Sequence, residues 1–122
     1  MLNDTTSPNE SIIACNLNAI SADQRELHEV LSHSLFAAVQ EIQTLPNGYA
    51  FRLPSTSAMI LKAAEYVANE RLCCPFFNFT LEIEPNERSF WLRLTGDEGV
   101  KVFIKAEFPA ILDPGIVATA GL

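Results

Sequence analysis

Apolar and polar positions alternate along this chain with two different periods. Apolar residues recur at three- and four-residue steps in three stretches, which is typical of amphipathic helices. Four other stretches alternate with a period of two, which is typical of half-buried strands. The predicted helices span residues 21–42, 55–72 and 98–108, and the predicted strands span 11–17, 49–53, 77–84 and 90–94.

The resulting order, β-α-β-α-β-β-α, indicates an α+β fold with two layers. We expect one four-stranded sheet, mixed or antiparallel, with its helices mainly on one face. Length and turn signals place this single domain at residues 11–112. Residues 1–10 are polar and are predicted to be disordered, and residues 113–122 are predicted to be a loosely held tail.

Capping and turn residues give the expected boundaries. Ser21 and Gln24 have the spacing of a capping box at the start of the first helix. The run 45–48 (Leu-Pro-Asn-Gly) is expected to end that helix in a turn. Asp97 is expected to cap the third helix.

The apolar stripe of the first helix is expected to face the core. Its members are Leu27, Val30, Leu31, Leu35, Ala38 and Ile42. His28 and His33 lie off this stripe and five residues apart, so they are not neighbours on a helix face. We expect both histidines at the solvated surface.

The second helix ends beside two adjacent cysteines. Its expected buried side comprises Ile60, Ala63, Ala64, Val67, Ala68 and Leu72. At 100° per residue, Cys74 lies near the edge of this side, whereas Cys73 lies nearly opposite its centre. Pro75 is expected to end the helix. The two thiols are therefore predicted to have different surroundings, with Cys73 on the polar side.

The outer face of the predicted sheet carries an aromatic residue among charges. The residues on that face are Ala50, Arg52, Thr80, Glu82, Trp91 and Arg93. An exposed Trp91 beside Arg93 and Arg52 favours an interface, most simply that of a homodimer. The alternative is that the tryptophan merely covers the sheet edge.

Charge and hydropathy exclude several classes. The net charge is −7, with 15 acidic and 8 basic residues, so a phosphate backbone would be repelled. We expect no nucleic-acid partner. No apolar run approaches the ~20 residues that cross a bilayer, and the N-terminus lacks the apolar centre of a signal peptide. We therefore expect a cytoplasmic protein with no membrane partner.

The cysteines are the main candidate chemistry. Three cysteines, an odd number, argue against a disulfide framework in a reducing compartment. Cys73 and Cys74, joined by Cys15, could bind a soft ion, because thiolates prefer such ions. The candidate residues around these thiols are Glu70, Arg71 and Tyr66.

Two other kinds of thiol site are disfavoured. Zinc sites usually separate paired cysteines by two to four residues. Thioredoxin-like sites lie at a helix N-terminus, whereas a helix C-terminus and Glu70 both oppose a thiolate. The remaining alternative is structural, since cysteine is among the most buried residue types, and Cys15 fits that role well.

The run from Glu70 to Phe79, Glu-Arg-x-Cys-Cys-Pro-Phe-Phe-x-Phe, resembles a motif in a family of small bacterial proteins. The resemblance covers about residues 11–108 and extends to Cys15, to Arg-Leu-Pro at 52–54, to Leu-Thr-Gly at 94–96 and to Glu-Gly-Val-Lys at 98–101. Some family members accompany genes for mercury or other heavy-metal handling. The resemblance thus implies soft-metal handling and no catalytic residue.

Two functions of different classes follow. The first is a protein that binds or senses a soft metal or metalloid through its vicinal cysteines, a soft ion being its expected cofactor. The second is a non-catalytic homodimeric module in which the cysteines are structural. An enzyme is not favoured, because the sequence has no nucleophile-base constellation and no phosphate-binding loop.

Overall fold

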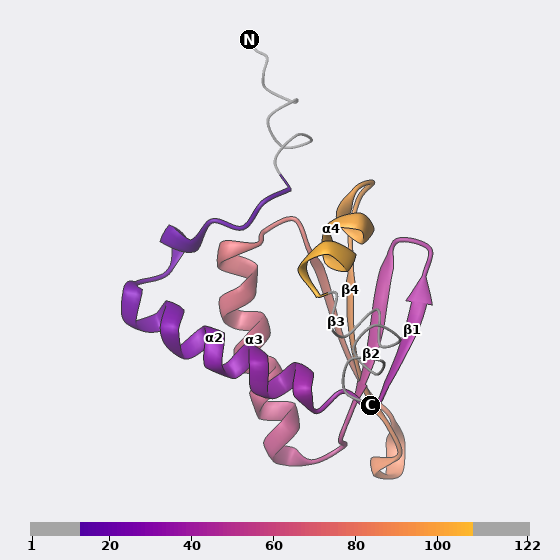
Figure 1. The fold of residues 1–122 in the computed structure, drawn as a ribbon. Helices are drawn as coiled ribbons and strands as arrows, with labels where there is room; N and C mark the ends of the chain where they lie inside the picture. Colours follow the sequence, from indigo (N-terminus) through magenta and orange to yellow (C-terminus); the bar gives the residue numbers. More distant parts are fainter. Residues whose placement is uncertain (1–12, 109–122) are drawn as a thin grey trace, which may run out of the picture.

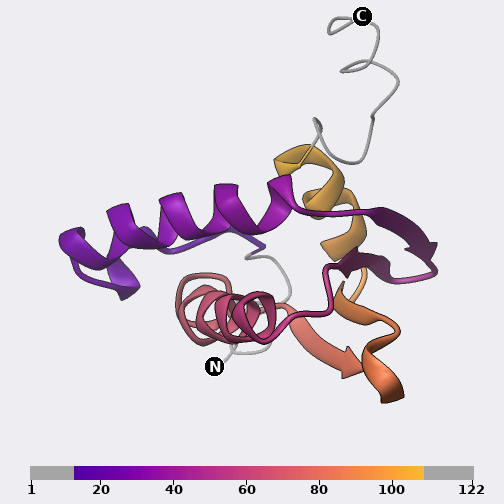
Figure 2. The same cartoon turned by 90° about the horizontal axis from the view of Figure 1, so that it is seen from below.

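The computed structural model describes residues 13–108, which form a four-stranded sheet with the α-helices on one face (Figures 1 and 2). The helices of this region are η1 (Leu17–Ala19), α2 (Ala22–Ala37), α3 (Ser57–Cys73), η2 (Pro85–Glu87) and α4 (Val100–Glu107). Its strands are β1 (Glu41–Leu45), β2 (Gly48–Leu53), β3 (Asn78–Ile83) and β4 (Phe90–Thr95). The segments predicted to be disordered or loosely held, 1–10 and 113–122, lie outside the described residues.

The predicted α+β class and the four-stranded sheet are confirmed. The strand order is β1-β2-β4-β3, and every neighbouring pair is antiparallel. The register places Leu92 between Phe51 and Leu81. Alternate apolar residues of β2 and β4 therefore share one face, and helices α2, α3 and α4 add side chains to the same core.

One predicted strand is wrong, and a different segment takes its place. Within the described residues, 13–17 contain no strand, and a short 3-10 turn begins at Leu17. The fourth strand is instead β1, which was predicted to be the end of the first helix. Helix α2 ends at Ala37, and the chain then turns at Pro46-Asn47 so that β1 pairs with β2. Pairing along a whole strand outweighs the helical spacing of Ala38 and Ile42.

One helix start follows its sequence signal and another does not. The Ser21 side chain accepts a hydrogen bond from the Gln24 amide, as predicted. Helix α4 does not use Asp97 as its cap. Its cap is Gly99, whose φ of 98° lies in the left-handed region, where glycine is favoured.

Helix α2 is rotated relative to its predicted face. Leu27 and Val30 are 67% and 65% exposed, whereas Leu35 and Phe36 are buried. The prediction that Leu27 and Val30 pack inward is therefore wrong. The reason is that α2 packs on α3 through the face that contains His28 and Leu35.

Helix α4 packs against the core through its apolar side chains. Val100 and Ile104 are buried, and Phe103 and Phe108 contact the core. None of the helices in the described region combines the length and the apolar character needed to cross a membrane.

The outer sheet face differs from its prediction. Trp91 is only 9% exposed, so the expectation of an exposed tryptophan is wrong. Its cross-strand partners are Arg52 and Glu82, and side chains directly opposite each other on one sheet face lie side by side. Arg52 pairs with Glu41 at 2.9 Å and Arg93 pairs with Glu82 at 2.6 Å. The homodimer interface stays a prediction, but Trp91 is too buried to be its exposed aromatic residue.

Candidate functional site

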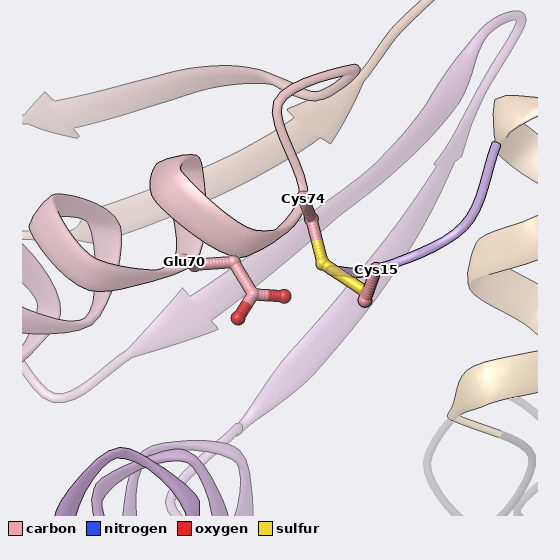
Figure 3. Close-up of side chains that lie close together, drawn as sticks. All are labelled: Cys15, Glu70 and Cys74. Carbon is pink, nitrogen blue, oxygen red and sulfur yellow. A yellow bond between two sulfur atoms is a disulfide. The ribbon is translucent and has the colours of Figure 1, made fainter. Parts of the chain in front are cut away.

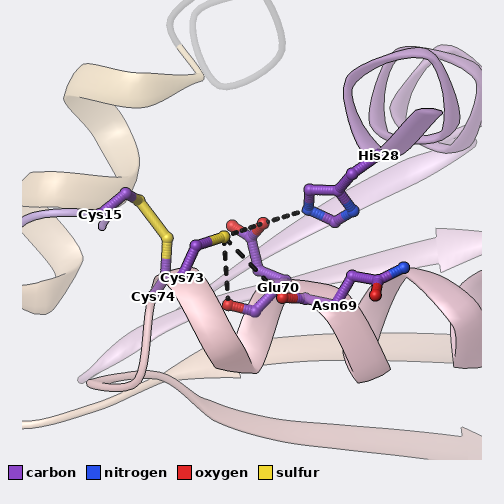
Figure 4. The surroundings of a disulfide bond; sticks show 6 residues. All are labelled: Cys15, His28, Asn69, Glu70, Cys73 and Cys74. Atoms are coloured by element: carbon purple, nitrogen blue, oxygen red, sulfur yellow. Dashed lines mark hydrogen bonds and ion pairs between the residues drawn. A yellow bond between two sulfur atoms is a disulfide. The ribbon is translucent and has the colours of Figure 1, made fainter. Parts of the chain in front are cut away.

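The C-terminal end of α3 separates the two adjacent cysteines. Cys73 is the last helical residue, and Cys74 follows as the cap, with its amide donating to the Glu70 carbonyl at 2.7 Å. Pro75 cannot continue a helix, so the backbone leaves the helical path here. As a result the Cys73 side chain points toward Glu70 and His28, while that of Cys74 points toward Cys15 (Figure 4).

Cys74 forms a disulfide bond with Cys15, 59 residues earlier, with the two Cα atoms 4.6 Å apart. The prediction that the chain has no disulfide is therefore wrong. The odd cysteine count left one thiol over, Cys73, which is free and buried. The Asn16 amide also donates to the Cys73 carbonyl at 2.6 Å, so the segment before α2 is tied to the end of α3 twice.

Glu70 lies at the centre of the arrangement. Its Oε1 is 2.7 Å from His28 Nε2, and the two residues are 9% and 8% exposed, respectively. A carboxylate oxygen of Glu70 also lies within 4.8 Å of both sulfur atoms of the disulfide (Figure 3). The prediction that His28 is at the surface is wrong, whereas His33 is exposed as predicted.

Cys73 is 2% exposed, so its predicted position on a solvated side of α3 is wrong. Tyr66, Glu70 and Cys73, on the face of α3 that was expected to be polar, are buried together with Ala63. Ala64, Ala68 and Leu72, which were expected to be buried, are exposed. The Cys73 Sγ lies 3.6 Å from the Glu70 carbonyl oxygen and 3.8 Å from Glu70 Oε1. Burial, followed by the negative charge of Glu70, raises the pKa of the Cys73 thiol to about 11. At neutral pH this cysteine is a thiol.

Tyr66 completes the buried group. Its ring stacks on His28 with centroids 5.5 Å apart. Burial and the neighbouring Glu70 charge raise the pKa of the Tyr66 hydroxyl well above its ordinary value. Among the described residues, neither the Tyr66 hydroxyl nor His28 Nδ1 has a hydrogen-bond partner. Unpaired buried polar atoms are costly, so both atoms require an explanation.

These residues share one cavity of about 970 Å³. Its lining includes Cys15, His28, Tyr66, Glu70 and Cys73, and thus joins α2, α3 and the segment before α2. Apart from Arg71, the residues predicted to surround the thiols are found there. Arg71 is exposed on α3, and the predicted interface residues Arg52, Trp91 and Arg93 are on the sheet.

His28 was missed although the sequence contained a signal for it. It precedes Leu31 and Leu35 by three and seven residues, so it continues their helical face. Assigning it to the surface relied on treating Leu27 and Val30 as core residues. A histidine on an apolar face needs a polar partner when buried, and Glu70 provides it.

Two groups of metal-ligating side chains meet at this helix end. One contains Cys15, Cys74 and Glu70, and the other contains His28, Glu70 and Cys73. In each group the ligand atoms lie within 4.8 Å of one another. A scan against family models, a search of curated proteins and a search of solved structures each returned no match. The family resemblance of Glu70–Phe79 therefore stays a prediction.

Proposed function

We propose that this protein binds or senses a soft metal ion or metalloid through Cys15 and Cys74 after their disulfide has been reduced. The observation that carries the proposal is the meeting of these two cysteines across 59 residues of sequence. Sulfur atoms that are close enough to bond to each other are also close enough to bind one soft ion, since thiolates are its preferred ligands. The family resemblance points in the same direction.

The proposed cysteine pair differs from the pair expected from sequence. Adjacent Cys73 and Cys74 point toward different neighbours, Glu70 and Cys15 respectively (Figure 4). Cys73 is also held as a thiol by burial and by Glu70, which raise its pKa to about 11. A thiol that keeps its proton is a weaker ligand than a thiolate. Cys73 is therefore a third ligand only if its side chain turns.

The redox step that opens the site is simple. A dithiol reductant supplies two electrons and two protons, which break the S–S bond and leave two thiols and an oxidised reductant. Binding of Hg(II) then releases the two thiol protons and forms two metal–sulfur bonds. The oxidised protein lacks these two ligands, so binding depends on the redox state.

Phenylarsine oxide, which reacts with two neighbouring thiols, is the probe for this proposal. The full chain is reduced, freed of reductant and titrated, and the complex is counted by intact mass spectrometry. We expect one equivalent to bind the reduced protein and none to bind the oxidised protein. Cys15→Ser and Cys74→Ser are each expected to abolish stable binding.

Cys73→Ser is the matched control, because it removes one sulfur and leaves the proposed pair. It is expected to bind as the wild type does. Loss of binding in Cys73→Ser, with Cys15→Ser unaffected, would assign the ion to the adjacent pair instead. Undiminished binding by Cys15→Ser, or binding by the oxidised protein, would overturn the proposal.

A further inference from the structure

The second ligand group, His28, Glu70 and Cys73, is independent of the disulfide. His28 comes from α2 and the other two from successive turns of α3, so the group exists only in the folded chain. All three residues are buried, with exposures of 8%, 9% and 2%. They supply one nitrogen, one oxygen and one sulfur ligand, whereas the Cys15–Cys74 pair supplies sulfur alone.

We propose that His28, Glu70 and Cys73 bind a divalent cation of intermediate softness, best matched by Zn²⁺, while the disulfide is intact. Zinc accepts histidine nitrogen, carboxylate oxygen and cysteine sulfur together. Softer ions favour all-sulfur sites and harder ions favour all-oxygen sites, so the mixed set selects this class. This inference goes beyond the proposed function, because it uses different ligands and does not require reduction.

The two distances to Glu70 Oε1 fit such an ion with a small adjustment, and the third pair, His28 Nε2 and Cys73 Sγ, lies within 4.8 Å. With Zn–N and Zn–O bonds of ~2.0 Å and a Zn–S bond of ~2.3 Å, a tetrahedral ion separates N from O by ~3.3 Å and S from O by ~3.5 Å. The Cys73 Sγ to Glu70 Oε1 distance is 3.8 Å, already near that value. His28 Nε2, at 2.7 Å from Glu70 Oε1, has to move outward by roughly half an ångström.

The protons can be accommodated as well. His28 Nε2 binds an ion only through its lone pair, so the ring proton has to reside on Nδ1. No described residue hydrogen-bonds to Nδ1, so a water in the cavity that His28 lines has to accept the Nδ1 proton. Cys73 is a thiol in the metal-free protein, but a coordinated dication removes the proton of a bound thiol, so this proton passes to solvent as the metal–sulfur bond forms.

The cavity accounts for the remaining coordination position. Three protein ligands leave a tetrahedral ion one open position, which water or a small ligand fills. The three ligands line the cavity of about 970 Å³, together with Tyr66. The Tyr66 hydroxyl, which lacks a partner among the described side chains, is available to hydrogen-bond a water in that cavity.

Cobalt is the probe, because it replaces zinc and reports its ligands by absorption. The oxidised, metal-free full chain is titrated with Co²⁺ and then with Zn²⁺. We expect one Co²⁺ per chain, with a thiolate-to-cobalt charge-transfer band that Zn²⁺ abolishes. Cys73→Ser should lose that band, and His28→Gln and Glu70→Gln should each weaken binding by at least ~10-fold, as loss of a ligand costs more than loss of its supporting partner.

His33→Gln is the matched control for His28→Gln, since both histidines are on α2 and both line the cavity. It should leave the affinity within about twofold, as expected for a residue outside the ligand set. The double variant Cys15→Ser/Cys74→Ser should also keep the cobalt band, because His28, Glu70 and Cys73 remain, although it lacks both sulfur atoms proposed above to bind the arsenical. Failure of one proposal is thereby distinguished from failure of the other.

Folding of each variant is checked by near-ultraviolet circular dichroism, because His28 and Glu70 also join α2 to α3. If a variant does not fold, the rate at which Cys73 is alkylated in the wild-type protein is measured instead. Zn²⁺ is expected to slow that alkylation, while Mg²⁺ at the same concentration does not. The inference would be overturned if the oxidised protein gave no cobalt band or if the band survived in Cys73→Ser. It would also be overturned if Zn²⁺ did not slow the alkylation of Cys73.

Discussion

At the scale of single residues, Glu70 determines the chemistry of its neighbours. Its carboxylate is buried beside His28, beside the Cys73 thiol and beside the disulfide. A buried charge has to be paired, and His28 provides the closest partner. Burial, followed by the same charge, favours the neutral forms of Cys73 and Tyr66, both of which have raised pKa values. Burial and one acid together therefore keep two potential nucleophiles protonated.

The raised pKa of Cys73 predicts a loss of stability at alkaline pH. The folded protein binds the thiol proton more tightly than the unfolded chain does, because the pKa rises from 9.0 to about 11. This contribution is complete below pH 9 and is lost as the pH rises through 11. We expect the free energy of unfolding to fall by on the order of 2 kcal/mol between about pH 8 and pH 10.5.

Urea denaturation of the oxidised protein at the two pH values measures this loss. Cys73→Ser is the reference, because it retains the disulfide and Tyr66 and should lose correspondingly less stability. Equal losses in the wild type and in Cys73→Ser would contradict the prediction.

At the scale of elements, local signals identified most helices and strands but not their neighbours. Strand β2 and the β3–β4 hairpin follow from the alternation of apolar and polar residues, a signal that is local in sequence. The helical spacing that continued to Ile42 hid β1, because Ile42 suits either period. The strand structure of this segment is decided by the pairing of Ile42 with Phe51, a contact that no local pattern reveals.

Gly48 tests the pairing of β2 with β4. A Cβ at this position would overlap the Leu94 carbonyl oxygen and lie 2.8 Å from the Thr95 Cα, both backbone atoms that cannot move aside alone. Gly48→Ala should therefore destabilise the protein by roughly 2 kcal/mol or more, as measured by urea denaturation.

Thr44→Ala, at an exposed position of the same hairpin, is the control and should cost less than ~1 kcal/mol. If Gly48→Ala were as stable as the wild type, the close approach of β2 and β4 would be incorrect.

At the scale of the whole molecule, the class and the location of the site were predictable, but its composition was not. The sequence indicated an α+β domain with chemistry at the end of α3, and Cys15, Glu70 and Tyr66 are found there. The disulfide, the burial of Cys73 and the role of His28 depend on what covers the second side of α3. That side is covered by α2 and by the segment before it, whose positions are set by contacts distant in sequence.

The disulfide predicts a large contribution to global stability. It closes a loop of 59 residues, and constraining such a loop in the unfolded chain is worth up to ~4 kcal/mol. We expect Cys15→Ser to unfold at lower urea concentration than the wild type by the equivalent of about 2–4 kcal/mol.

Reductant supplies the control for this prediction. In excess dithiothreitol the wild type should lose most of the unfolding free energy by which it exceeds Cys15→Ser, because both proteins then lack the cross-link. A wild type whose midpoint does not respond to reductant would contradict the Cys15–Cys74 assignment.

The covalent tie between Cys15 and the end of α3 also affects how the protein is handled. The segment that leads into α2 is anchored through that bond and through the Asn16 amide. Purification buffers with and without a thiol additive therefore yield molecules that differ in one bond. The Cys15–Cys74 disulfide, which anchors the segment before α2, is reduced in one preparation and intact in the other. Affinities obtained from such preparations are comparable only when the oxidation state of each sample has been measured.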